Sequence, residues 1–212
     1  MKNSIILFSF ASFLGFAMFS CTLTKGTHDM VDIKAINSHI RLDIKYATSD
    51  NFTKQKVYSQ PKAYLRKEVV EQLDKVQKDL EKQGLGLKVW DAYRPHSVQY
   101  KFWELVPDER YVANPAKGSR HSRGAAVDLT LVDSSGKELT MPTEFDNMTE
   151  KAHRDYMQLP EEAIRNREIL EKAMAAHGFK GLPTEWWHFD YKKWQKYDLL
   201  DVSFEELSRN KA

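Results

Sequence analysis

Hydrophobic residues recur along this chain at two spacings, and each spacing predicts a type of secondary structure. Apolar side chains at every second position from Ile40 to Tyr46 predict a strand over residues 40–48. Between residues 64 and 84 the apolar side chains lie three or four residues apart, which places them on one face of a helix. Gly84 is a typical residue to end that helix.

The rest of the chain reads as further helices and strands. The predicted segments are a strand at 85–95, a helix at 96–106 that Pro107 stops, a hairpin at 124–141 with its turn at DSSG, a helix at 160–178 that begins at Pro160 and ends at Gly178, and an aromatic strand at 184–194. These segments do not alternate as regular βαβ units. The pattern therefore favours an α+β fold, a single domain with a central antiparallel sheet flanked by helices.

Length and charge narrow the class of protein. The chain has 212 residues, a length typical of one domain, and its 42% hydrophobic content is sufficient for a core. Its 32 basic residues nearly balance its 30 acidic residues, and neither half of the chain is strongly basic. Nucleic-acid binding therefore has no electrostatic support.

The first twenty residues differ from the rest of the chain. Lys2 precedes the apolar run IILFSFASFLGFAMFS, which ends at Cys21, the only cysteine. The run has the length of a signal peptide and is short for a membrane span. Ser20 followed by a lone cysteine resembles a bacterial lipoprotein signal, although Met18 and Phe19 are bulky for that role. An ordinary cleaved signal, or an uncleaved anchor, is the alternative.

We therefore expect residues 1–20 to be a signal peptide and Cys21 to be lipidated as the mature N-terminus. Residues 21–30 are polar and are predicted to form a tether, and residues 31–212 the folded domain. The expected location is the periplasmic side of the membrane, as an exported, lipid-anchored protein. A single cysteine excludes an internal disulfide.

One acidic residue stands out in the segment SRHSRGAAVDLTL. Asp128 lies between Val127 and Leu129 in a strand-like apolar run, and His121 lies in the polar loop before it. A carboxylate in such surroundings requires an ion-pair partner or a metal ion.

Three short segments, DAYRP, SRHSRGAAVD and TEWWHFD, hold polar residues among apolar or aromatic ones. Together they offer Arg94, His121, Asp128, Glu185 and His188. Two histidines and one carboxylate are a usual ligand set for a catalytic zinc ion. A further carboxylate can act as general base on water, and an arginine can stabilise the oxyanion that forms. Glu185 is the spare acid and Arg94 the candidate arginine.

The spacing of the last segment adds a structural condition. On a regular strand, Glu185 and His188 would point to opposite faces. The chain must therefore turn or bulge between them if both are to reach one site, and Pro183 makes a turn plausible. Trp186 and Trp187, between the two, would then wall the site.

Each of these residues also has a structural interpretation. A single histidine is more often a hydrogen-bonded structural residue than a metal ligand, and Asp128 could simply pair with an arginine. Glu185 could be solvated, and Arg94 could cap a turn at Pro95. The chain has no HExxH or paired CxxC motif that would settle the question from the sequence.

The combined motifs resemble a known family. SRHSRGAAVD fits S-x-H-x-x-G-x-A-x-D, and EWWH fits the E-x-W-H type of signature of the zinc D-alanyl-D-alanine dipeptidases, which include the vancomycin-resistance dipeptidase. The resemblance runs over most of the chain after about residue 30. It implies hydrolysis of the small dipeptide D-Ala-D-Ala to D-alanine, with one Zn²⁺ per chain held between the sheet and its loops.

The resemblance also implies a role for each residue of the site. His121, Asp128 and His188 match the zinc ligands. Glu185 matches the base that takes a proton from the attacking water and passes it to the leaving amine, and Arg94 the group that steadies the oxyanion. Ser119 and Asp146 match positions that hold the two ends of the dipeptide, with Asp146 pairing the free amine.

Two other functions stay open at this point. One is a D,D-carboxypeptidase or endopeptidase of the same zinc fold, acting on longer cell-wall peptides. The other is a non-catalytic peptidoglycan-binding lipoprotein, although binding alone requires neither Glu185 nor Arg94. The leader argues against a role in the cytoplasm and favours salvage or turnover of D-Ala-D-Ala outside the inner membrane.

Overall fold

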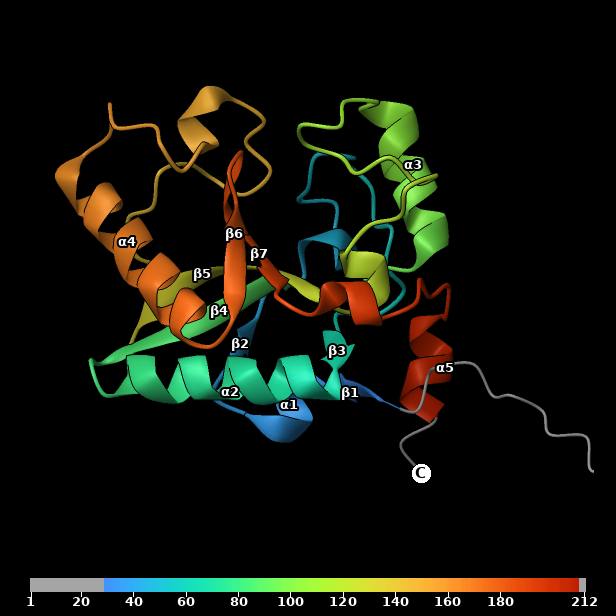
Figure 1. Cartoon of the computed structure of the whole chain (residues 1–212), viewed down its shortest axis with the longest axis horizontal. Coiled ribbons are helices and arrows are strands. Elements are labelled where there is room, and N and C mark those ends of the chain that lie inside the picture. The colour runs from blue at the N-terminus through green and yellow to red at the C-terminus, as the bar shows by residue number, and fades with distance from the viewer. Residues whose placement is uncertain (1–28, 210–212) are drawn as a thin grey trace, which may run out of the picture.

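A five-stranded sheet runs through the part of the chain that the computed structural model describes, residues 29–209 (Figure 1). The strands lie in the order β2-β4-β5-β7-β6, and their bounds are β2 Arg41–Leu42, β4 Leu85–Asp91, β5 Ala126–Asp133, β6 Phe179–Leu182 and β7 Glu185–Tyr191. β2 runs parallel to β4, and the other neighbouring strands are antiparallel. The prediction of an α+β domain with a central antiparallel sheet is thus confirmed, with β2 as a parallel addition at one edge.

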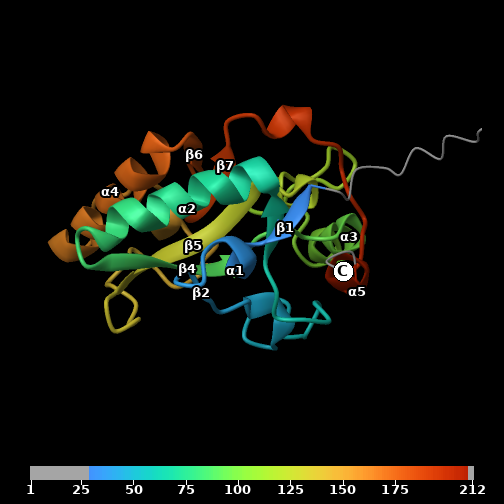
Figure 2. The same cartoon turned by 90° about the horizontal axis from the view of Figure 1, so that it is seen from below.

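Helices flank this sheet. Their bounds are α1 Ile33–Ile36, α2 Lys67–Glu81, α3 His96–Leu105, α4 Glu161–Ala176 and α5 Phe204–Arg209. α2 and α4 pack against each other and against the sheet, while α3 and α5 lie at the other side of the molecule (Figure 2). α2 turns the apolar face predicted from its spacing into the core, so that Val69, Leu73, Val76 and Leu80 are buried. The helices predicted at 96–106 and 160–178 are therefore confirmed, and the one predicted at 64–84 is confirmed from Lys67 onward.

The register of the central strands places three polar residues in one row. β5 lies between β4 and β7 and is buried along almost its whole length. Asp128 on β5 lies opposite Asp91 on β4 and opposite His188 on β7. Because directly opposite residues of neighbouring strands project from the same face of a sheet, the register brings these three side chains together. The buried acid that stood out in the sequence is therefore at the centre of the sheet.

Of the strand predicted at 40–48, only Arg41 and Leu42 form a strand, and the rest of the prediction is wrong. β2 ends at Leu42, and residues Lys45–Ala47 form a 3-10 turn, although Ile44 and Tyr46 are buried as the alternation predicted. A strand needs a partner for its backbone groups, and the ladder between β2 and β4 pairs only Arg41 with Lys88 and Leu42 with Val89. The alternation of apolar residues therefore predicted correctly which side chains are buried, but it did not predict where the strand hydrogen bonds end.

The returning strand of the hairpin predicted at 124–141 is also absent from the described residues. Only an isolated bridge between Val132 and Glu138 remains of it. The turn itself forms, because the carboxylate of Asp133 accepts hydrogen bonds from the backbone of Ser135 and Lys137. The chain then leaves the sheet, and its Thr140 carbonyl accepts a hydrogen bond from Asn166 of α4.

Several described elements were not predicted from the sequence: α1, β6, α5 and a small antiparallel pair of strands. The pair consists of β1 Met30–Asp32 and β3 Tyr64–Arg66, so residues 64–66 are a strand and not the first turn of α2. Asp29 and Met30, at the end of the range assigned to the tether, already belong to the fold, since Asp29 pairs with Arg66 at 2.6 Å.

The predictions that concern the leader, Cys21 and the first part of the tether lie outside the described residues. Within residues 29–209, none of the helices has the length and apolar character needed to cross a membrane.

Candidate active site

One cavity of about 360 Å³ collects every site residue that the sequence predicted within the fold. Its lining includes Arg94, Ser119, His121, Asp128, Asp146, Glu185 and His188. These residues come from separate segments: the loop after β4, the 3-10 turn before β5, β5 itself, the loop after β5, and β7. The fold therefore assembles in one place what the sequence distributes over almost a hundred residues.

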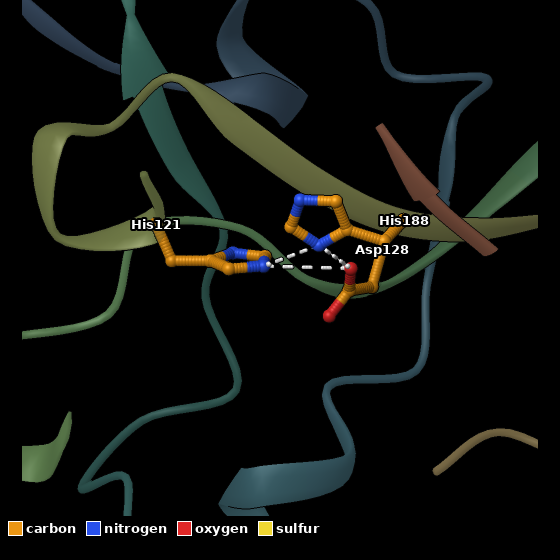
Figure 3. Close-up of side chains that lie close together, drawn as sticks. All are labelled: His121, Asp128 and His188. Carbon is orange, nitrogen blue, oxygen red and sulfur yellow. Dashed lines mark hydrogen bonds and ion pairs between the residues drawn. The ribbon is translucent and has the colours of Figure 1, made fainter. Parts of the chain in front are cut away.

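Three of these side chains converge on one point (Figure 3). His121 Nε2 lies 3.1 Å from His188 Nδ1 and 3.4 Å from Asp128 Oδ1, and His188 Nδ1 lies 3.0 Å from the same oxygen. Ligand atoms about 2.0–2.2 Å from a tetrahedral ion are spaced roughly 3.3 Å apart. The spacing of the three atoms is therefore that of a tetrahedral ligand set, and the three residues could hold a metal ion.

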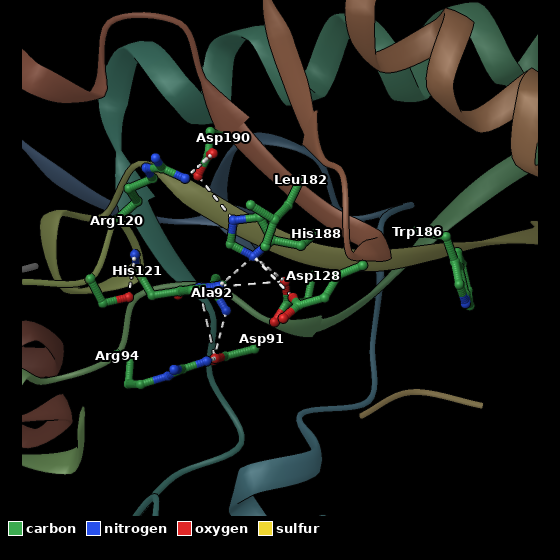
Figure 4. Close-up of polar contacts among 12 residues, drawn as sticks. Asp91, Ala92, Arg94, Arg120, His121, Asp128, Leu182, Trp186, His188 and Asp190 are labelled. Atoms are coloured by element: carbon green, nitrogen blue, oxygen red, sulfur yellow. Dashed lines mark hydrogen bonds and ion pairs between the residues drawn. The ribbon is translucent and has the colours of Figure 1, made fainter. Parts of the chain in front are cut away.

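The outer hydrogen bonds of the two histidines decide which ring nitrogens face inward. His121 Nδ1 lies 2.7 Å from the carbonyl oxygen of Ala92, which can only accept, so Nδ1 is the donor. His188 Nε2 lies 2.9 Å from a carboxylate oxygen of Asp190, and Asp190 is itself paired with Arg120 at 2.7 Å (Figure 4). In neutral rings the inward nitrogens then both carry lone pairs. Lone pairs this close repel unless a cation lies between them, which is the arrangement of metal-ligating histidines.

The electrostatics of the cluster also favour a bound metal ion. Burial by itself would lower the pKa of His188, but the charge of Asp190 and hydrogen bonds to Asp128 and Asp190 outweigh it and raise that pKa to about 10. Burial would raise the pKa of Asp128, yet the two histidines hold it well below its usual range. The site thus attracts positive charge strongly, and a metal ion that binds there displaces a proton.

Glu185 reaches the same cavity because β7 bulges. β6 residues Gly181 and Leu182 are adjacent, but their partners on β7 are Phe189 and Glu185, four positions apart. The bulge predicted between Glu185 and His188 is therefore present, and Glu185 Oε2 lies 3.8 Å from His188 Nδ1. Burial raises the pKa of Glu185 to about 8, against the opposing charge of His188. The carboxyl group has the proton affinity expected of a general base near neutral pH.

The two tryptophans of the bulge do not both wall the site, as the sequence had suggested. Trp187 lines the cavity. Trp186 lies away from the cluster of ligands (Figure 4). It is fully buried in the core, donates to the hydroxyl oxygen of Thr143 at 2.9 Å, and packs against Trp90. Successive strand residues face opposite ways, so only one of the pair can face the cavity.

Arg94 is held rigidly at the cavity wall. Its Nε and Nη2 donate to one carboxylate oxygen of Asp91 at 3.1 and 2.6 Å, and its Nη1 donates to Gln99 at 2.8 Å. The guanidinium also lies 4.5 Å from the ring centroid of Phe102. Tyr58 donates to the other oxygen of Asp91 at 2.8 Å. A guanidinium fixed in this way can stabilise negative charge without first reorganising.

Asp146 and Ser119 lie at other parts of the same wall. The hydroxyl of Tyr46 donates to both oxygens of Asp146, at 3.0 and 3.1 Å. Burial and the charge of Asp128 raise the pKa of Asp146 to about 7. The hydroxyl oxygen of Ser119 accepts the backbone N–H of His121 at 3.2 Å, so its hydrogen is left to donate to another group.

Some residues of the site were not singled out from the sequence. Asp91 and Asp190 belong to the segments DAYRP and TEWWHFD. Asp91 is three residues from Arg94 and Asp190 two residues from His188, and this proximity in the sequence could have identified both as partners of site residues. Tyr46 gave no such signal, because its place in the alternating run indicated the core only. Its ring is buried while its hydroxyl reaches the cavity.

Activation of water against a carbonyl group is the chemistry that this arrangement serves. The fold and the site together define the class of the protein as a metal-dependent peptidase. The family model described as D-Ala-D-Ala dipeptidase, of the Peptidase M15 group, matches residues 26–205, and the chain belongs to that family.

Individual relatives agree with this assignment. The D-alanyl-D-alanine dipeptidase of Escherichia coli (strain K12) is 39% identical over 178 residues, which are 84% of this chain and 92% of that protein. The D-alanyl-D-alanine dipeptidase of Streptomyces coelicolor is 34% identical over 79% of this chain and 93% of that protein. Among solved structures, an LD-carboxypeptidase aligns with 20% identity and a TM-score of 0.44 over 85% of this chain and 77% of that chain, a likeness too distant to inform on the reaction.

Proposed function

We propose that this protein hydrolyses D-Ala-D-Ala at a zinc site formed by His121, Asp128 and His188. The observation that carries the proposal is the convergence of two imidazole lone pairs and one carboxylate oxygen within 3.0–3.4 Å of one another. Two nitrogen ligands and one carboxylate, with a position left open toward the cavity, are a usual set for catalytic zinc. When bound, zinc polarises the scissile carbonyl and makes water a stronger nucleophile at neutral pH.

The residues of the chain supply the proton transfers and the charge stabilisation. Glu185 accepts the proton of the attacking water on a carboxylate oxygen and delivers it to the leaving amine. Arg94 directs its remaining N–H groups at the oxygen on which negative charge develops. Asp91 orients the guanidinium and helps to keep it charged: burial would lower the pKa of Arg94, but the charge of Asp91, together with those of Tyr58, Tyr46 and Asp128, raises it well above its usual value.

The charge balance of the cavity favours a substrate with a free amine. Asp91 is neutralised by Arg94 and Glu109 by Lys117, which leaves Asp128, Asp146 and Glu185 as the acidic groups of the described cavity wall that have no lysine or arginine partner. A zinc ion and one substrate ammonium would together balance these three carboxylates. We assign the ammonium to Asp146 and the carboxylate end of the dipeptide to the hydroxyl of Ser119.

This assignment predicts strong selectivity for free dipeptides. The wild-type protein is expected to hydrolyse D-Ala-D-Ala and to act about 100-fold or more slowly on N-acetyl-D-Ala-D-Ala, because the neutral amide would leave Asp146 buried and unpaired. Asp146→Asn is expected to weaken dipeptide turnover and to narrow the gap between the two substrates. The measurement is kcat/KM for both substrates, with exposed Asp155→Asn as the matched control.

Rapid cleavage of the acetylated dipeptide by the wild-type protein would instead identify a D,D-carboxypeptidase. A zinc-loaded protein that cleaves neither substrate would favour the remaining alternative, a non-catalytic peptidoglycan-binding protein.

We also propose that the protein is exported and anchored by lipid on Cys21 at the periplasmic side of the membrane. The support is the apolar run that ends in Ser20 and Cys21, ahead of a family match that begins at residue 26. A single acyl chain anchors weakly, whereas several chains on one cysteine anchor stably.

The anchor predicts that the mature protein stays with the membrane fraction and incorporates labelled fatty acid. Cys21→Ser is expected to abolish the label and to release the protein or leave it unprocessed. A wild-type protein found free in the soluble fraction would refute the anchor and leave an ordinary cleaved signal.

A further inference from the structure

The bulge of β7 is contacted by one arginine, Arg154, whose side chain is only 10% exposed. We propose that Arg154, in the loop before α4, is a positioning residue that fixes this bulge and so directs Glu185 and His188 into the same cavity. The inference rests on the proposed function, since it concerns the base and a ligand of that site.

Arg154 contacts the β6–β7 hairpin at four carbonyl groups. Its Nε donates to the carbonyl oxygen of Leu182 on β6 at 2.9 Å, and its Nη2 donates to those of Trp186 and His188 on β7 at 2.9 and 2.8 Å. Its backbone N–H donates to the carbonyl oxygen of Pro183, in the turn of the hairpin, at 2.9 Å. Leu182 lies on β6, whereas Trp186 and His188 lie within the bulged stretch of β7 (Figure 4).

The bulge explains why carbonyl groups need such a partner. Residues 186–188 of β7 lie opposite no residue of β6, because the register jumps from Phe189 to Glu185. Buried carbonyl groups that lose their ladder partner must be satisfied by another donor. The guanidinium supplies these donors from a planar group that reaches both strands at once.

The hairpin is shaped to receive this side chain. A Cβ built on Gly181 of β6 would lie only 2.1 Å from Cζ of Arg154. The guanidinium also lies 4.4 Å from the ring centroid of Phe189 on β7. Gly181 does not have a positive φ, so the glycine provides room for Arg154 and is not required by the backbone conformation.

Arg154 acts through the backbone and not on the substrate. Among the described residues that line the cavity, Arg154 is absent, while Glu185 and His188 are both present. On a regular strand these two side chains, three positions apart, would face opposite ways. Loss of the arginine is therefore expected to disturb the ligand and the base together.

The test compares Arg154→Lys with Arg167→Lys. Lysine keeps the charge but carries its donors on one atom, so it cannot span the carbonyl groups that Nε and Nη2 contact separately. Arg167 is an equally suitable buried arginine, since it donates to the carbonyl oxygens of His153 and Tyr156, outside the hairpin. The measurements are thermal stability, zinc affinity by chelator competition, and kcat and KM for D-Ala-D-Ala at saturating zinc.

Arg154→Lys is expected to weaken zinc binding by about 10- to 100-fold, the range for groups that orient metal ligands. At saturating zinc its kcat should still fall about 10-fold or more with little change in KM, because Glu185 is misplaced. Arg167→Lys should lose stability only. A folded Arg154→Lys variant with wild-type zinc affinity and kcat, or equal losses in both variants, would overturn the inference.

Gly181→Ala tests the same contact with the arginine still present, should Arg154→Lys fail to fold. The added methyl group must displace the guanidinium, so the same loss of zinc affinity and kcat is expected. Gly86→Ala on β4, where the new Cβ would lie 3.1 Å from Gln77 Nε2, is the matched control. Normal zinc affinity and kcat in Gly181→Ala would contradict the inference.

The outcome separates this inference from the proposed function. A wild-type protein that binds zinc but does not cleave D-Ala-D-Ala would refute the function, while the difference in zinc affinity between Arg154→Lys and Arg167→Lys would still decide the role of Arg154. Wild-type hydrolysis with unchanged Arg154→Lys would refute the inference alone.

Discussion

Glu185→Gln is expected to keep its zinc and to hydrolyse D-Ala-D-Ala about 100-fold or more slowly than the wild-type protein, the usual scale of general acid–base catalysis. Glutamine has the shape of glutamate but cannot accept the proton of the attacking water. The carboxyl group of Glu185 approaches His188 Nδ1 only to 3.8 Å, farther than Asp128 Oδ1 at 3.0 Å. Metal content should therefore survive this substitution.

The measurement is kcat at saturating substrate, together with zinc per chain. Exposed Glu144→Gln is the matched control and should retain full activity. A zinc-loaded Glu185→Gln variant with near-normal kcat would rule out Glu185 as the base. Loss of zinc in that variant would instead indicate that Glu185 takes part in holding the metal.

Substitution of the predicted ligands should have the other large effect. The purified wild-type protein is expected to hold about one zinc per chain, and His121→Ala or His188→Ala should bind it at least 100-fold more weakly and lose activity with it. Removing groups that only orient ligands already costs roughly 10- to 100-fold in affinity. Loss of a ligand itself leaves two donors, which do not complete a catalytic site.

Thermal stability gives an independent readout of the same site. Ligand binding to the folded state alone stabilises it by about 4 kcal/mol when the free ligand is at 1,000 times its dissociation constant. Chelators should therefore lower the Tm of the wild-type protein but not that of His121→Ala or His188→Ala. His177→Ala, which removes a histidine paired with Asp79 at the surface, is the control. Full zinc content in both ligand variants would show that the assignment is wrong.

Periodicity predicted the helices better than the strands, and the reason is local. A helix satisfies its backbone hydrogen bonds within its own segment, so the apolar spacing in α2 was enough to place it. A strand depends on a partner elsewhere in the chain. Residues 43–48 alternate like a strand but have no continuous ladder in β4, and residues 179–182 form β6 only because β7 follows after a two-residue turn.

The chemistry of the site was determined by the sequence to a large extent. Residue types, their order and the motif spacing identified the family and selected the candidate ligands His121, Asp128 and His188, because these side chains carry the chemistry whatever the backbone does. The sequence also required a bulge between Glu185 and His188, since three positions on a regular strand cannot share a face.

Only the tertiary structure decided how these groups are oriented and charged. Ring orientation depends on the Ala92 carbonyl and on Asp190, and the proton affinity of Glu185 depends on burial. Arg154 donates hydrogen bonds to residues of the hairpin that lie more than 30 positions later in the chain. Such properties arise from distances between segments, and the order of residues alone does not contain those distances.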